Sequence, residues 1–181
     1  SPLDPFINPR SIALFGSMQE NWFFGPGVII GDLLKWNYPG RIYPIHPTAS
    51  TVYGLLVHKD LSAVDDVPEL AVIATSFKHV SGILRQCGAK GVKAAVIISD
   101  GFAEAGPEGK IRQEELLAIA KTFGIRLMGP NTVGVFNTEH RFTTLPYERG
   151  YDYDKRGQLS IIAQTGVYSP QAIGWHEYEP G

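Results

Sequence analysis

The chain has 181 residues, of which 44% are hydrophobic and 19% charged, as expected for one globular domain with room for the start of another. Lys and Arg number 16 against 18 Asp and Glu, so the chain lacks the basic excess that nucleic-acid binding requires, and no apolar run reaches membrane-spanning length. The single cysteine, Cys87, excludes an internal disulfide and a multi-thiolate zinc site, so we expect a cytoplasmic protein.

The first half of the chain alternates short apolar runs with helical patterns. Strands are predicted at residues 11–15 and 41–45, separated by a helix at 27–36, and a short edge strand is predicted at 55–58. Such an alternation is typical of βαβ units. The predicted fold class is therefore α/β, with a Rossmann-like parallel sheet covered by helices on both faces.

The same alternation continues in the second half. Strands are predicted at 70–74, 94–98 and 126–128, and helices at 78–87 and 108–123. The run at 94–98 is almost continuously Val, Ile and Ala, which indicates a strand buried on both faces in the middle of the sheet. These elements complete a first domain over residues 1–145.

The pattern changes after this domain. Residues 143–157 contain Pro146, two glycines and six charged residues without apolar periodicity, and residues 146–156 are predicted to be a linker. A strand at 158–163 and a helix beginning near residue 168 follow. One βα unit cannot bury both faces of its strand, so residues 157–181 either complete the first sheet or, as we favour, begin a truncated second domain.

Every predicted main strand ends in a small or polar cluster. In a parallel sheet the carboxyl ends of the strands share one edge, which is where ligands bind in open α/β folds. The clusters are Phe15-Gly16-Ser17, Ile45-His46-Pro47, Ala74-Thr75-Ser76, Ile98-Ser99-Asp100-Gly101, Met128-Gly129-Pro130-Asn131 and Ala163-Gln164-Thr165-Gly166.

The loop after the first strand does not favour a nicotinamide cofactor. Residues 16–27 lack the G-x-G-x-x-G fingerprint, and the second strand ends in His46-Pro47 instead of an acidic residue for the ribose. An NAD(P)-dependent oxidoreductase domain is therefore the weakest alternative. What remains is a strand, a Gly-Ser turn and a helix N-terminus, which can hold a phosphate.

Five segments, in this order, resemble one family. They are residues 9–13, 43–47, 96–102, 129–134 and 160–166, and the Gly-Pro-Asn and Gln-Thr-Gly sequences in the last two are the most distinctive. The chain resembles, from residue 6 to about 175, the CoA-binding part of the NDP-forming acyl-CoA synthetases, which include the succinyl-CoA synthetase α subunit and ADP-forming acetyl-CoA synthetase. This resemblance implies a flavodoxin-like second domain after the Rossmann-like one.

The resemblance also implies a site for CoA. The loop after the first strand would approach the CoA phosphates, Pro47 would flank the adenosine, the next loops would line the pantetheine, and Asn131 would order the loop near the thiol. The first-domain residues are Gly16, Ser17, Met18, Gln19, Glu20, Asn21, Pro47, Ser76, Phe77, Ile98, Ser99, Asp100 and Asn131. Gln164, Thr165 and Gly166 match the phosphate-holding turn that opens the family's second domain.

The sequence departs from the family at three places. His46 replaces an Asn, Thr48 replaces a basic residue, and Trp22-Phe23-Phe24 is an aromatic insert that would cover the adenine, block it or dock a partner. The family's phosphohistidine lies beyond residue 181 and its ATP-grasp module is absent, so CoA binding without turnover is predicted, with no catalytic residue. The partners would be the missing second domain and an ATP-grasp domain or subunit.

Several of these features also have simpler explanations. His46 and His79 could be solvent-facing or capping residues, Cys87 a small buried apolar group, and Gly-Pro-Asn and Ser99-Asp100 plain turns. Neither catalysis by Cys87 nor a metal site is favoured, since no His, Asp, Glu or Cys grouping has metal-ligand spacing. A regulatory module that senses CoA or acyl-CoA without ligase activity is the main functional alternative.

Overall fold

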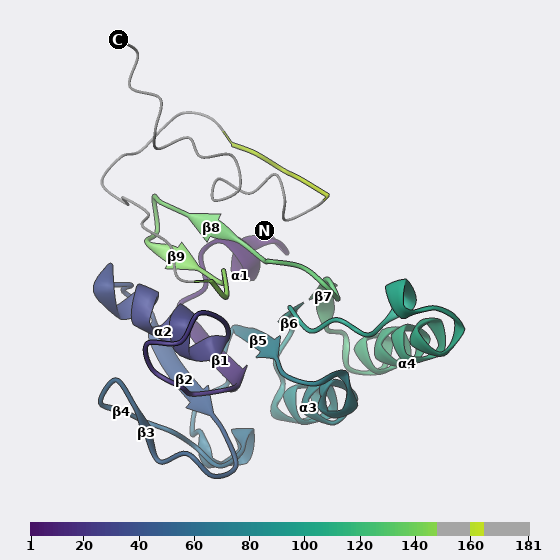
Figure 1. Ribbon diagram of the computed structural model, residues 1–181, viewed down its shortest axis with the longest axis horizontal. Helices are drawn as coiled ribbons and strands as arrows, with labels where there is room; N and C mark the ends of the chain where they lie inside the picture. The colour runs from purple at the N-terminus through teal and green to yellow at the C-terminus, as the bar shows by residue number, and fades with distance from the viewer. Residues whose placement is uncertain (148–159, 165–181) are drawn as a thin grey trace.

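A five-stranded parallel sheet forms the centre of the protein, for which the computed structural model describes residues 1–147 and 160–164 (Figure 1). The strand order is β2-β1-β5-β6-β7. The order places the switch point between β1 and β5, where the connections leave toward opposite faces. The strands are β1 Ser11–Gly16, β2 Arg41–Ile45, β5 Leu70–Ala74, β6 Ala94–Ile97 and β7 Arg126–Met128.

Helices cover both faces of this sheet, as predicted. Helices α1 (Asp4–Ile7) and α2 (Pro26–Lys35) lie on one side, and α3 (Phe77–Lys90) and α4 (Pro107–Phe123) lie on the other (Figure 1). The two long helices end at Gly91 and Gly124, which have the left-handed φ values of 99° and 65° that favour glycine. Short 3₁₀ turns, η1 (Leu61–Ala63) and η2 (Ala103–Ala105), precede β5 and α4.

Each face of the sheet has its own hydrophobic core. Along β1, Ile12 and Leu14 pack toward α1 and α2, whereas Ala13 and Phe15 pack toward α3 and α4. Burial on both faces explains why the predicted strands are nearly uninterrupted apolar runs. Strand β6 lies between β5 and β7, so the predicted position of the most apolar run inside the sheet is confirmed.

Two small antiparallel hairpins accompany the main sheet. The first pairs β3 (Thr51–Val52) with β4 (Leu55–Leu56), so the short strand predicted at 55–58 is present over 55–56 but pairs with β3 and not along the main sheet. The Gly54 turn allows these residues to pair with the preceding segment, and only His58 bridges to Ile45 of β2. The second pairs β8 (Phe136–Asn137) with β9 (Phe142–Thr143) and has no counterpart among the predicted elements.

The chain after β9 remains attached to the first domain as far as Tyr147. The Gly25 N–H donates to the Pro146 carbonyl at 2.8 Å, and Phe24 forms an antiparallel bridge with Tyr147. The first two residues of the predicted linker therefore pack on the domain. Residues 160–163 belong to no strand, because no described segment pairs with them, and the predicted helix near residue 168 lies outside the described residues.

Among the described residues, no helix combines the length and apolar character needed to cross a membrane.

Candidate functional site

Gly16 marks the point where β1 ends against β5. It has a φ of +139° and faces Ala74 in the sheet register. A Cβ atom at this position would lie 2.0 Å from the Ala74 carbonyl oxygen, far inside van der Waals contact. A side chain is therefore excluded where the predicted phosphate loop begins, at the switch point of the sheet.

The loop of residues 17–21 folds back onto the N-terminus of α2. The Gly27 N–H donates to the Ser17 carbonyl at 3.1 Å, and a Cβ on Gly27 would lie 2.2 Å from the Gln19 carbonyl oxygen. Pro26 has no N–H, and the N–H of Val28 donates to the Gly25 carbonyl. The Gly27 amide thus holds the loop while the amides of Val28 and Ile29 bond to Gly25, so a phosphate would meet the loop itself and the positive end of the helix dipole.

The side chains of this loop divide into exposed and buried groups. Ser17, Gln19, Glu20 and Asn21 are exposed. Met18 is only 8% exposed and packs in the core on the α2 side of the sheet. Met18 therefore anchors the loop in the core.

The loops after β5, β6 and β7 are tied together by Ser99. Its buried hydroxyl accepts the Thr75 N–H at 3.1 Å and faces the Ile73 carbonyl at 3.5 Å, while its carbonyl accepts the Asn131 N–H at 2.9 Å. The structure thus brings together the predicted residues after three different strands. Ser76, Asp100 and Asn131 are exposed there, whereas Ile98 is buried and supports the loop.

Phe77 is a half-buried wedge between the loops after β5 and β6. The guanidinium of Arg112 lies 4.5 Å from the centre of its ring and donates through Nε to the Gly101 carbonyl at 2.9 Å. The Glu104 carboxylate accepts the N–H groups of Gly101 and Phe102. Partial burial raises the pKa of Glu104, but these hydrogen bonds outweigh it and the pKa lies below its ordinary value. The loop after β6 is therefore rigidly held beside Phe77.

His46 stabilises the turn after β2 in the way that an Asn would. Its Nδ1 accepts the N–H groups of Thr48 at 3.3 Å and Ala49 at 3.1 Å. An Asn side chain in a turn accepts backbone N–H groups in the same way. The departure from the family at this position therefore preserves the local turn, and Pro47 remains exposed after β2.

The aromatic insert lies next to the phosphate loop. Trp22 and Phe23 are 43% and 66% exposed, and their ring centres are 4.7 Å apart. The ring of Phe24 instead packs edge-on against Tyr147 at 5.2 Å. Two of the three aromatic rings are thus available at this edge, and the third attaches the end of the first domain.

The turn at residues 164–166 is not joined to this edge by any described contact. Gln164 is exposed, and Thr165 and Gly166 lie outside the described residues.

Two residues at this edge escaped the sequence analysis. Lys78 is exposed in the first turn of α3 and adds a positive charge beside Phe77. Its place directly after the predicted Ser76-Phe77 pair is a sequence signal that could have indicated this residue. Tyr53, from the β3–β4 turn, hydrogen bonds to Asn21. No sequence signal connects these two residues, which are 32 positions apart, so the contact could be found only from the structure.

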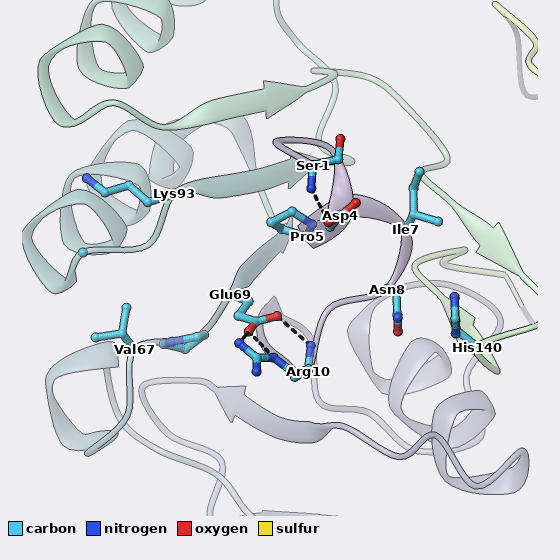
Figure 2. Close-up of a pocket in the computed structure, with 12 residues that line it drawn as sticks. Ser1, Asp4, Pro5, Ile7, Asn8, Arg10, Val67, Glu69, Lys93 and His140 are labelled. Carbon is cyan, nitrogen blue, oxygen red and sulfur yellow. Dashed lines mark hydrogen bonds and ion pairs between the residues drawn. The ribbon is translucent and has the colours of Figure 1, made fainter.

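A cavity of about 770 Å³ lies at the opposite edge of the sheet (Figure 2). Arg10, Glu69 and Lys93, which line it, directly precede β1, β5 and β6. The Glu69 carboxylate accepts two hydrogen bonds from Arg10, one from the backbone N–H at 2.8 Å and one from the side-chain Nε–H at 2.6 Å. Dashed lines mark these contacts in Figure 2. None of the predicted CoA residues lines this cavity.

Cys87 has no catalytic character in the structure. It is fully buried, and desolvation raises the pKa of its thiol to about 12. The described part of the chain also contains no group of three or more His, Cys, Asp or Glu side chains that could hold a metal ion.

The fold and site define a class of protein: an open parallel α/β domain whose ligand edge lies at a switch point between two strands. The chain belongs to the CoA binding domain family, whose model matches residues 10–138. The predicted family resemblance is therefore confirmed.

Two relatives of known activity define the family context. Acetate–CoA ligase [ADP-forming] II of Archaeoglobus fulgidus is 37% identical over 161 residues, covering 88% of this chain and 23% of the relative. The α subunit of acetate–CoA ligase [ADP-forming] II of Pyrococcus furiosus is 36% identical, covering 91% of this chain and 35% of the relative. The chain is thus a CoA-binding domain homologous to the α subunits of ADP-forming acetyl-CoA synthetases, and it spans a minor part of these relatives.

A solved structure agrees with these sequence matches. The dinucleotide-forming acetyl-coenzyme A synthetase 1 of Ca. Korarchaeum cryptofilum, in complex with phosphate and ADP, superposes with a TM-score of 0.74 and 35% identity. The match covers 79% of this chain and 30% of that chain.

Proposed function

We propose that this chain binds CoA as a substrate at the carboxyl edge of its parallel sheet. The diphosphate would lie on residues 17–21, the adenosine would extend toward Pro47, and the pantetheine would pass Ser76 and Phe77 toward Asn131. CoA is consumed as an acyl acceptor in the ligases that this family includes, so we treat it as a substrate and not as a resident cofactor.

The observation that carries this proposal is the convergence of four loops at one edge. Gly16 brings the end of β1 against Ala74 of β5, and Ser99 joins the loops after β5, β6 and β7. An elongated ligand with a charged diphosphate and a narrow polar arm fits such an edge, because the helix dipole of α2 favours the charge and the rigid loops favour the arm.

The proposal extends to a ligase of which this chain supplies one part. The relatives are ADP-forming CoA ligases, and one of them is an α subunit. In such a ligase the nucleotide chemistry would require an ATP-grasp module and a phosphorylated histidine from other segments or subunits. Gln164, Thr165 and Gly166 would open the domain that holds the phosphohistidine. Residues 1–147 would then present the CoA thiol without performing phosphoryl transfer.

Calorimetric titration of the purified chain tests the proposal directly. Saturable binding of CoA, with no heat from NADH or NADPH, is the expected result. Because Thr48 replaces a basic residue, dephospho-CoA should bind within about threefold of CoA, a difference of about 0.7 kcal/mol. Preference for a nicotinamide, or no binding of CoA, would contradict the proposal.

A second measurement separates a ligase part from a regulatory module. The chain, extended by its native downstream sequence and mixed with an ATP-grasp subunit from a related ligase, should form acyl-CoA from an acid, CoA and ATP. CoA binding without acyl-CoA formation in that mixture would favour a CoA-sensing module.

A further inference from the structure

Tyr53 occupies a backbone conformation that is unfavourable for its side chain. The β3–β4 hairpin turns at Tyr53 and Gly54, whose φ values of 46° and 78° are both positive. Two-residue hairpin turns with positive φ at both positions favour Asn, Asp or Gly at the first position. A bulky aromatic residue in this region is an outlier that persists only where its surroundings hold it.

The contacts of Tyr53 lie in the loop that we assign to the CoA phosphates. Its hydroxyl accepts the Asn21 N–H at 2.8 Å, and its own N–H donates to the Glu20 carboxylate. Its ring lies over α2, where a Cβ on Gly31 would be 3.1 Å from the Tyr53 hydroxyl. One residue thus contacts two successive loop residues and the helix behind them.

These contacts have two consequences for the loop. The hydrogen bond to Asn21 fixes a residue that itself has a positive φ of 53°, so the direction of the chain after the loop is set. The second bond holds the Glu20 carboxylate toward the hairpin. A carboxylate left to rotate in a phosphate loop would repel the ligand, because like charges at a few ångströms destabilise each other.

We propose that Tyr53 is a positioning residue of the CoA site, acting on residues 20 and 21 without touching CoA. The inference rests on the proposed function. A hairpin alone would be served better by Asn or Gly at position 53. The tyrosine is explained by its reach to the loop, since neither Asn nor Gly can place a hydroxyl on the Asn21 N–H.

Tyr53→Phe is the decisive variant, because it removes the hydroxyl and keeps the ring and the turn. The expected result is an increase in the CoA dissociation constant of about tenfold, because residue 21 is no longer fixed before CoA binds, with Tm within about 3 °C of wild type. Amide hydrogen exchange at Asn21, measured without CoA, should become faster in this variant. A merely structural tyrosine would lower Tm without this selective loss of affinity and protection.

Tyr53→Asn is the second variant, because it restores a favoured turn residue that cannot reach the loop. Its CoA affinity should fall at least as far as that of Tyr53→Phe. Tyr43→Phe is the matched control, since the Tyr43 hydroxyl donates to Asp66 away from the loop, and CoA affinity should stay at the wild-type value.

The outcomes separate this inference from the proposed function. Wild-type CoA binding together with unchanged affinity in Tyr53→Phe, or in Tyr53→Asn, would overturn the role of Tyr53 and leave the proposed function standing. A wild-type chain that does not bind CoA would overturn both.

Discussion

The two edges of the central sheet are built from different kinds of residues. At the carboxyl edge the chain uses close backbone contacts and exposed polar side chains, as at Gly16 and Ser17. At the amino edge it uses charged side chains that pair with one another, as Arg10 does with Glu69 around the cavity in Figure 2.

This difference argues against the amino-edge cavity as the ligand site. The charged groups that Figure 2 joins at the amino edge already have protein partners, so a ligand would have to compete with them. The carboxyl edge has the closer backbone packing, because a Cβ atom at Gly16 would lie 2.0 Å from a carbonyl oxygen, whereas at Gly91 and Gly124, before β6 and β7, it would meet no atom within 3.4 Å. Substitutions at the carboxyl edge should therefore alter CoA binding, whereas substitutions at the amino edge should leave it unchanged.

The largest expected effect is that of Gly16→Ala. The new Cβ would meet the Ala74 carbonyl oxygen at 2.0 Å in a backbone conformation that disfavours side chains. The free energy of unfolding should fall by on the order of 4 kcal/mol, and CoA binding should be lost with it. Gly25→Ala is the control, because Gly25 also has a positive φ but a Cβ there would have no atom within 4 Å, and about 1–2 kcal/mol should be lost. Equal losses in urea unfolding would show that the close approach is unimportant.

A tryptophan at each edge tests which of them binds CoA. Ser17→Trp fills the exposed loop at which we propose that the CoA phosphates bind, and it should weaken CoA binding at least 100-fold, about 2.7 kcal/mol, with an almost unchanged thermal transition. Asn8→Trp places the same bulk in the amino-edge cavity and should leave CoA affinity unchanged. Titration calorimetry of both variants measures this, and the reverse pattern would move the site to the cavity.

Ser99→Ala should weaken the junction between the loops without removing the site. The Thr75 N–H would lose its partner, so the free energy of unfolding should fall by about 1–2 kcal/mol. Ser76→Ala is the control, because the Ser76 side chain is exposed and forms no capping hydrogen bond. Urea unfolding of the two variants provides the measurement. A stability loss in Ser76→Ala equal to that in Ser99→Ala would contradict the assigned role of the Ser99 hydroxyl.

The smallest effect should come from Glu69→Gln at the amino edge. Partial burial raises the pKa of Glu69, but the hydrogen bonds and charge of Arg10 outweigh it and hold the pKa below its ordinary value of 4.5. A depressed pKa stabilises the folded state above pH 4.5, and this stabilisation is lost as the pH falls through the folded value.

Arg10 is 87% exposed, so the contribution of this pair is under about 1 kcal/mol. Wild type should therefore be slightly more stable than Glu69→Gln at neutral pH, and the difference should shrink in acid, while CoA affinity is the same in both. A stability difference that grows as the pH falls would show that the sign is wrong.

The main sheet could be predicted from the sequence because its signals are local. Strands 41–45, 70–74 and 126–128 have the predicted bounds, and the helix predicted at 108–123 begins one residue earlier. Continuous apolar runs and glycine stops depend on neighbouring residues only. The β8–β9 hairpin lacks such signals, because it is held by long-range packing of the fully buried Phe142 and by the Thr144 hydroxyl, which accepts the Val135 N–H.

The candidate site was predictable in its location but not in its internal support. The clusters at the strand ends and the family resemblance indicated which loops meet. The burial of Met18 and the hydrogen bonds of Ser99 and Tyr53 depend on contacts between segments that are distant in sequence. The ligand roles of the individual residues remain predictions.

The attachment of Tyr147 to Phe24 makes the exit of the chain part of the ligand edge. Phe24 lies three residues after Asn21, and the Gly25 N–H between the loop and α2 is held by Pro146. Residues 22–25 therefore connect residues 146 and 147 to the predicted phosphate loop. Were a ligand at residues 17–21 to strengthen the contacts of residues 24 and 25, thermodynamic reciprocity would require a contact that holds residue 147 to strengthen binding of that ligand by the same factor.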